Sequence, residues 1–392
     1  MTPTEITYTL LFSLPAYVAM MCGLYLVRMV CLKENPFGRR PFIITIVLYF
    51  VTMLVWFSQI LYYVFPEVYV TLNAFIFLTC LLIYVFSYRF VFEITKVYPS
   101  EKFSFFHFLT PLLGFVAMLT VSFLVPRDIL LSIARSGGVT ADGYKLFSLF
   151  FNSGIPLLLC MNVIYSLFGL RRIKRYHKVV VNYSADEYRG ALSWLYHYIF
   201  AMLAFFAGIG SLLIVSKLMQ VSIWFLLIPA LIAVFKYVIL LHNILLENFV
   251  IISIDGDGSS EYTDDTGFSP ESAETQQCKS TLSDKNLEAY MQKKKPYRNP
   301  KFKITDMTRD LNTNRTSLSS LINRTYGVNF SRFINRYRLQ ELMQIKSNPA
   351  NKKLTDEELV SLAGFSDYRG YLRVKFREEI NPDITWKDVL YR

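Results

Sequence analysis

Two short stretches near the C-terminal end carry polar and basic side chains at the spacing of a helix face. The first stretch offers hydroxyl, amide and guanidinium groups, at Arg315, Thr316, Ser319, Ser320 and Asn323. The second stretch offers three cations, at Arg369, Arg373 and Lys375. Small polar side chains and cations of this kind can enter a major groove, where they bond to base edges or phosphates. Both stretches are therefore candidate DNA-reading surfaces.

Apolar residues at three- and four-residue intervals predict the helices that would position the first stretch. A short helix is expected over 304–312, with Ile304, Met307 and Leu311 on one face. After the turn LNTN, Asn314 is a good N-cap for a second helix that ends at Gly327. This second helix would bury Leu318, Leu321 and Ile322. Two short helices joined by a tight turn predict a helix-turn-helix unit.

A second unit of the same kind follows a longer predicted helix over 330–346. Its first helix, over 355–362, starts with Thr355 and Glu358 at the spacing of a capping box. The turn AGFSD leads into the helix over 368–380, which carries the three cations. Two such units, spaced by one helix, can read two successive major-groove faces from a single chain.

Over about 80 residues, 302–381, the motifs resemble the AraC-type (AraC/XylS-like) DNA-binding domain. The matching pieces are LNTNRTSLSSLIN, YGVNF, FINRYRL around Arg338, and LAGFSDYRGYLR. The resemblance implies seven helices, two of them groove-reading, and control of transcription at target promoters. It assigns Arg315, Thr316, Ser319 and Ser320 to the first reading helix, and Arg369 and Arg373 to the second. The chain departs from the family at Lys375, where a bulky apolar residue is usual, and at 381–384, where Asn-Pro-Asp-Ile replaces Gly-x-Thr-Pro.

The remainder of the chain has the composition of a membrane protein. Hydrophobic residues make up 53% and charged residues 18%, whereas soluble chains carry about 25% charged residues. The apolar excess lies within residues 1–252, where seven stretches are long enough to span a bilayer: 6–27, 42–65, 68–88, 105–125, 146–170, 194–216 and 222–246. We therefore expect an all-α protein, with a seven-helix transmembrane bundle and a C-terminal all-α DNA-binding domain that has two helix-turn-helix units.

The distribution of Lys and Arg predicts the orientation in the membrane. Thirteen of these residues lie in the odd-numbered connections, and four lie in the N-terminal tail and the even-numbered connections. This bias puts the N-terminus outside and the C-terminus in the cytoplasm. The expected location is the bacterial cytoplasmic (inner) membrane, with a multi-pass topology.

Charge also separates the two ends of the chain. Residues 253–278 hold seven acids and no base, which predicts an acidic disordered linker over 253–284. Residues 279–392 hold 23 bases and 13 acids, an excess that favours a polyanionic partner such as nucleic acid or anionic lipid. The expected domains are a sensor or anchor domain over 1–252, the linker, and the DNA-binding domain over 285–392.

Few ionisable residues interrupt the predicted spans, and such residues are functional candidates by default. Lys236 near the middle of the seventh span, with His242 closer to its cytoplasmic end, makes a candidate intramembrane signal site. The alternative is that Lys236 snorkels or faces a small polar pocket of structural value. Five cysteines and four histidines are scattered without metal-ligand spacing, so we expect no metal, no cofactor and no catalytic residue.

The leading hypothesis is a membrane-bound one-component transcriptional regulator, not an enzyme. It would perceive a signal through its transmembrane domain and bind promoter DNA in the cytoplasm. Expected partners are double-stranded promoter DNA, the lipid bilayer, a second copy of the chain in a homodimer, RNA polymerase and an unidentified signal ligand. Two alternatives stay open: a membrane transporter or enzyme with a basic helical tail, and a protein whose basic domain binds lipid or protein.

Overall fold

The structure, a computed structural model, describes residues 3–32, 36–98, 100–136, 143–204, 227–252 and 283–380. All regular elements in these ranges are helices, which confirms the all-α class. The chain divides into two compact units. The first contains the apolar helices, and the second combines Val97–Ser100 and Arg175–Leu192 with Asn248–Arg392. Most of the predicted linker (253–282) and the terminal residues 381–392 lie outside the described residues.

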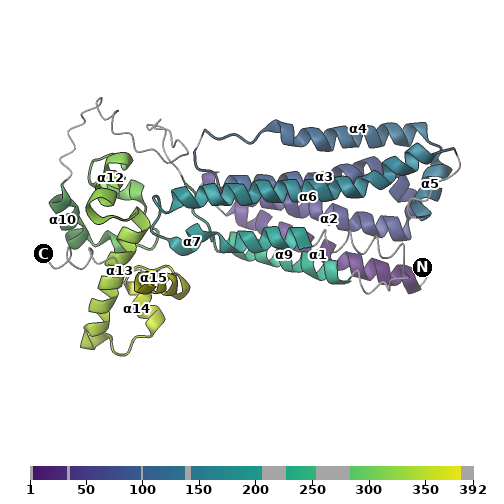
Figure 1. Ribbon diagram of the computed structural model, residues 1–392. Helices are drawn as coiled ribbons and strands as arrows, with labels where there is room; N and C mark the ends of the chain where they lie inside the picture. Colours follow the sequence, from purple (N-terminus) through teal and green to yellow (C-terminus); the bar gives the residue numbers. More distant parts are fainter. Residues whose placement is uncertain are drawn as a thin grey trace, which may run out of the picture. The chain divides into compact units, whose positions relative to one another are not determined.

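Six of the described helices are long and apolar enough to cross a membrane, and they match six of the seven predicted stretches (Figure 1). They are α1 (Pro3–Cys31), α2 (Pro36–Val64), α3 (Pro66–Ile94), α4 (Leu109–Leu124) with the preceding η1 (Phe105–Phe108), α6 (Lys145–Val180) and α9 (Leu227–Leu245). The remaining stretch, 194–216, is helical up to residue 204, and its other residues are not described.

Within the apolar unit, α2 packs against both α1 and α3, and α9 packs against α1. Large apolar side chains stay exposed on this bundle, among them Leu10, Leu113 and Phe123. A surface of this kind suits hydrocarbon, because lipid tails are as apolar as the side chains themselves. A further helix, α5 (Arg127–Arg135), lies between the fourth and fifth predicted spans and was not predicted from the sequence.

The second unit contains the helices that the apolar spacing predicted. These are α11 (Ile304–Asp310), α12 (Arg315–Tyr326), α13 (Phe330–Ser347), α14 (Asp356–Leu362) and α15 (Tyr368–Ile380). The unit also contains four short elements that the sequence did not predict: α7 (Glu187–Ala191), α10 (Asp284–Lys294), η3 (Pro296–Arg298) and η4 (Pro349–Asn351). The local signals at the helix ends are confirmed. Asn314 caps α12, Gly327 ends it with a φ of 66°, and Thr355 and Glu358 form the capping box of α14.

The long helix α13 joins two helix pairs, because it packs against α12 near one end and against α14 near the other. In the first pair, Leu318 and Ile322 of α12 and Phe333 of α13 are fully buried. The second pair has a core of its own, formed by Leu342, Leu359, Val360, Ala363, Phe365, Tyr371 and Val374. Two small cores on one shared helix give a unit with two similar halves.

A segment from the middle of the chain completes this unit. The backbone of Ala185 donates to Phe302, that of Ile304 donates to Tyr183, and that of Ser331 donates to Val181. Ser184 and Lys303 thus form an isolated antiparallel bridge. From the sequence, residues 171–193 are only a basic connection between two spans. In the structure, part of that connection belongs to the compact C-terminal unit.

Candidate nucleic-acid interface

The first candidate surface is the outer face of α12. Thr316, Ser320 and Asn323 are exposed, and Arg315 and Ser319 are half-buried. The opposite face of the helix is buried through its leucines and isoleucine. All five side chains singled out from the sequence therefore lie at or near the surface of one short helix. Their hydroxyl, amide and guanidinium groups could form hydrogen bonds with a groove.

The start of α12 depends on Asn314, whose side-chain oxygen accepts a hydrogen bond from the Ser317 amide at 2.7 Å. Asn314→Ala should lower the free energy of unfolding of this unit by about 1 kcal/mol, whereas Asn314→Gly should cost only a few tenths. Pulse proteolysis of the full chain across a urea series would measure both. Equal stability of the alanine variant and the native chain would contradict the capping role.

The second candidate surface lies on α15, where the structure separates the three cations that the sequence grouped. Arg369 and Arg373 are exposed and one helical turn apart, so they share a face. Lys375 is also exposed, but six residues at 3.6 per turn place it about 120° around the helix from Arg369. Its ammonium pairs with Glu379 at 3.7 Å. Phe376, which the sequence did not assign to this surface, lies on the arginine side and is 58% exposed.

The flank of α15 beside this face contacts the mid-chain segment. Arg373 lies over the ring of Tyr188, with its guanidinium carbon 5.6 Å from the ring centroid. A side chain at Gly370 would lie in van der Waals contact with the Cβ of Tyr188, at 3.5 Å. Arg377 donates two hydrogen bonds to Glu187, at 2.6 and 2.8 Å. Sequence reasoning missed Glu187, Tyr188 and Arg377, since no local pattern pairs residues about 190 positions apart.

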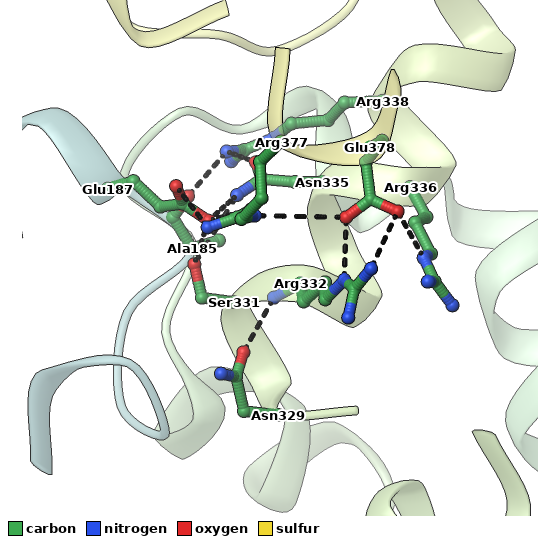
Figure 2. A network of polar contacts seen from close by, with 10 residues as sticks. All are labelled: Ala185, Glu187, Asn329, Ser331, Arg332, Asn335, Arg336, Arg338, Arg377 and Glu378. Atoms are coloured by element: carbon green, nitrogen blue, oxygen red, sulfur yellow. Dashed lines mark hydrogen bonds and ion pairs between the residues drawn. The ribbon is translucent and has the colours of Figure 1, made fainter. Parts of the chain in front are cut away.

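Two carboxylates link α15 to α13, as Figure 2 shows. Glu187 accepts hydrogen bonds from Ser331 at 3.1 Å and Asn335 at 3.0 Å, in addition to those from Arg377. Glu378 accepts from Arg332 at 2.6 Å and from Arg336 at 2.9 Å. Charge-assisted hydrogen bonds of this kind are stronger than neutral ones. They therefore help to fix α15 on α13.

Arg338 is the buried centre of the unit, with 1% of its surface exposed. Its guanidinium donates to the backbone carbonyls of Ala185, Tyr297 and Asn299, and to the side chain of Asn335, at 2.8–3.0 Å. Burial lowers the pKa of Arg338 to about 10, against the opposing effect of Asp186 and Glu187. The side chain therefore stays charged at pH 7, and its charge is balanced by the mid-chain segment.

The turn between α14 and α15 rests against η3, and the η3 residues are themselves held in place. Glu341 of α13 accepts hydrogen bonds from Lys295 at 2.9 Å, from Tyr297 at 2.8 Å and from Arg298. These partners lower the pKa of Glu341, although its burial acts in the opposite direction. Glu341 therefore holds the side chains at and beside η3, and Arg338 holds the backbone carbonyl of Tyr297.

The chain has no match among protein-family models, curated proteins or solved structures. The AraC-type resemblance therefore depends on the motifs quoted from the sequence and stays an expectation.

The two candidate residues of the membrane part lie apart. Lys236 of α9 is 5% exposed, and its ammonium lies 5.2 Å from the ring centroid of Tyr237. His242 lies six residues later and is exposed. The structure therefore does not bring Lys236 and His242 into one site, and only Lys236 is buried.

Proposed function

We propose that this protein is a membrane-bound transcriptional regulator that binds promoter DNA sequence-specifically through its C-terminal unit. The observation that carries the proposal is the pair of similar helix–turn–helix halves, α11–α12 and α14–α15, on the single helix α13. In each half the second helix exposes polar or cationic side chains on one face and buries apolar side chains on another, although α15 also exposes Phe376 beside its arginines. That is the arrangement by which a recognition helix enters a major groove.

Charge supports the choice of a nucleic acid as partner. Residues 279–392 carry ten more bases than acids, and such an excess attracts a polyanion. A general lipid-binding module would need cations alone, whereas α12 offers mainly hydroxyl and amide groups, which suit base edges. The lipid-binding and protein-binding alternatives are therefore less well supported than DNA binding.

The chain segments that make up the second unit support a seven-span topology. The segment before Leu192 and the residues after Asn248 belong to one compact unit, so they must lie on the same side of a membrane. The chain between them must then cross the membrane an even number of times. The helix α9 is one crossing, so the other would lie within residues 193–226, where the stretch 194–216 is predicted. This side also holds the basic connections, which favours a cytoplasmic C-terminus.

In this proposal the membrane helices sense a signal and the C-terminal unit converts it into altered promoter binding. The buried Lys236 is the candidate residue of the membrane part, since a buried cation in a span is costly and is kept mainly for function. A second copy of the chain in the same bilayer is the expected dimer partner, because tethering raises the effective concentration. RNA polymerase is the expected downstream partner.

The proposal predicts different effects for the three cations of α15. Arg369→Ala and Arg373→Ala should each weaken binding to a preferred duplex about tenfold to hundredfold, the range of one lost base contact. Lys375→Ala is the matched control and should preserve sequence preference, because Lys375 points away from the arginine face. The full chain in phosphatidylcholine nanodiscs would first select its most enriched genomic fragment. Its affinity for that duplex would then be compared with its affinity for a scrambled duplex of equal length.

Salt dependence provides an independent measurement on the same samples. Affinity should fall steeply with salt concentration, since each phosphate contact releases a counterion. Equal affinity of the full chain for the enriched and the scrambled duplex at moderate salt would overturn the proposal. Salt-dependent binding without preference would instead favour a general polyanion-binding module.

A further inference from the structure

We propose that the loop between the fifth and sixth predicted spans is a permanent part of the C-terminal unit. It would attach that unit to the membrane domain independently of the segment 253–281. The unit would then stay bound to the membrane domain even after that segment is cut. This inference goes beyond the proposed function, because it requires only that the loop is docked, whatever the unit binds.

The backbone of the loop is integrated into the fold of the unit. Three main-chain hydrogen bonds, at 3.0–3.2 Å, join residues 181–185 to residues 302, 304 and 331. The loop residues Tyr183, Ser184 and Ala185 are at most 3% exposed. Buried backbone groups need such partners, since each lost partner leaves a polar group without water or protein to bond. Undocking the loop would therefore expose a buried surface and break several hydrogen bonds at once.

Side chains on both sides of the loop add to this attachment. The buried Arg338 uses one of its nitrogens for the Ala185 carbonyl, and Lys303 lies over the ring of Tyr183 at 5.5 Å. Asp186 accepts a hydrogen bond from Ser366, and Glu187 contacts both α13 and α15. The loop therefore contacts both halves of the unit, one through residues 302–304 and the other through the start and flank of α15.

The loop is continuous in sequence with membrane segments at both ends. Its first residues are the last turns of α6 (Lys145–Val180), and the sixth predicted span begins at residue 194. The C-terminal unit thus has one attachment through the chain at 253–281 and a second through the docked loop. Cleavage at 253–281, one conceivable way to release such a unit, would remove only the first attachment.

A cleavage experiment on the full chain tests this directly. A site for a specific protease is inserted within 253–281, an affinity tag is placed at the N-terminus, and the protein is cut in detergent micelles. We expect the fragment 282–392 to stay with the tagged fragment through a wash at about 1 M salt, where the Debye length is about 3 Å. Under these conditions the cut fragment cannot be retained by electrostatic adsorption to lipid, because detergent replaces the bilayer and salt screens the charges. Release of most of the cut fragment into the wash would overturn the proposal.

A disulfide trap gives a residue-specific readout. Ser184 and Lys303 are an antiparallel pair without mutual hydrogen bonds, a geometry in which Cα atoms lie about 4.5 Å apart, within disulfide range. Ser184→Cys with Lys303→Cys, in a chain with Cys31, Cys160 and Cys278 replaced by serine, should join the two cut fragments under oxidation. The control pairs Ser184→Cys with Lys293→Cys in α10 and should not. Cross-linking equal in both pairs, or absent from the first, would show that the loop is not docked in this register.

Discussion

Replacement of Arg338 by leucine is expected to lower the free energy of unfolding of the C-terminal unit by about 3–5 kcal/mol. The guanidinium is almost fully buried and donates to three backbone carbonyls that come from the mid-chain loop and the η3 region. Leucine would fill much of the space but would leave these carbonyls without donors. Lysine should not rescue the loss, since a single ammonium cannot match the planar fork of arginine.

The matched control is Arg309→Leu in α11, because the Arg309 side chain is 76% exposed and forms a surface ion pair with Asp306 in the preceding turn. An exposed pair of this kind contributes little, so the change should stay within about 0.5 kcal/mol. Both variants would be compared by pulse proteolysis of the full chain in urea, following the band that contains residues 283–380. If the two variants unfold at the same urea concentration, the central role of Arg338 is wrong.

Replacement of Gly364 by alanine should destabilise the same unit by at least about 3 kcal/mol, a value reserved for severe steric conflicts. Gly364 has a φ of 97°, which side-chain-bearing residues rarely adopt. An added Cβ would overlap the carbonyl oxygen of Tyr297 and lie 2.6 Å from the Cα of Arg298. The Tyr297 carbonyl cannot move away without losing its hydrogen bond from Arg338, and a shift of the η3 backbone would also disturb the side-chain bond from Arg298 to Glu341.

Gly327→Ala is the control variant, because it tests the cost of the backbone conformation without the steric overlap. Gly327 also has a positive φ, of 66°, but an added Cβ would meet no atom within 4 Å. Gly327→Ala should therefore cost only about 1–2 kcal/mol, the penalty for a left-handed conformation. The urea midpoints of the two alanine variants, measured by the same proteolysis assay, should differ clearly. Similar midpoints would mean that the turn before α15 adjusts and that its contact with η3 is loose.

Much of the C-terminal unit could be predicted because its signals are local. The helices α12 and α15 follow from apolar spacing, and their limits follow from Asn314, Gly327 and the turn before Tyr368. Each of these signals acts within four residues of the place where it determines the structure. The six apolar helices were predictable for a similar reason, since length and composition alone decide whether a helix can span a bilayer.

What could not be predicted depends on contacts between distant parts of the chain. The Glu187–Arg377 ion pair joins residues 190 positions apart, and one sequence contains no pattern that pairs them. The side of α15 on which Lys375 lies was not predicted for another reason. Its charge alone grouped it with the two arginines, whereas its angular position around the helix axis separates it from them. The short helix α5 lies in an even-numbered connection, and it was not predicted because it is too short and too polar to appear as a long apolar stretch.

The presence of a mid-chain loop inside the C-terminal unit has a consequence for biosynthesis. Ala185 and Arg338 bond although 153 residues separate them, so at about 5–20 residues per second the loop waits roughly 10 to 30 s for its partner. In the proposed topology, two intervening spans must both enter the bilayer during that time. A chain that inserts one span too few would leave Tyr183 and Arg338 on opposite sides of the membrane, and the unit could not close. Folding of this unit would then act as a check on correct membrane insertion, since only correctly threaded chains would become competent to bind their partner.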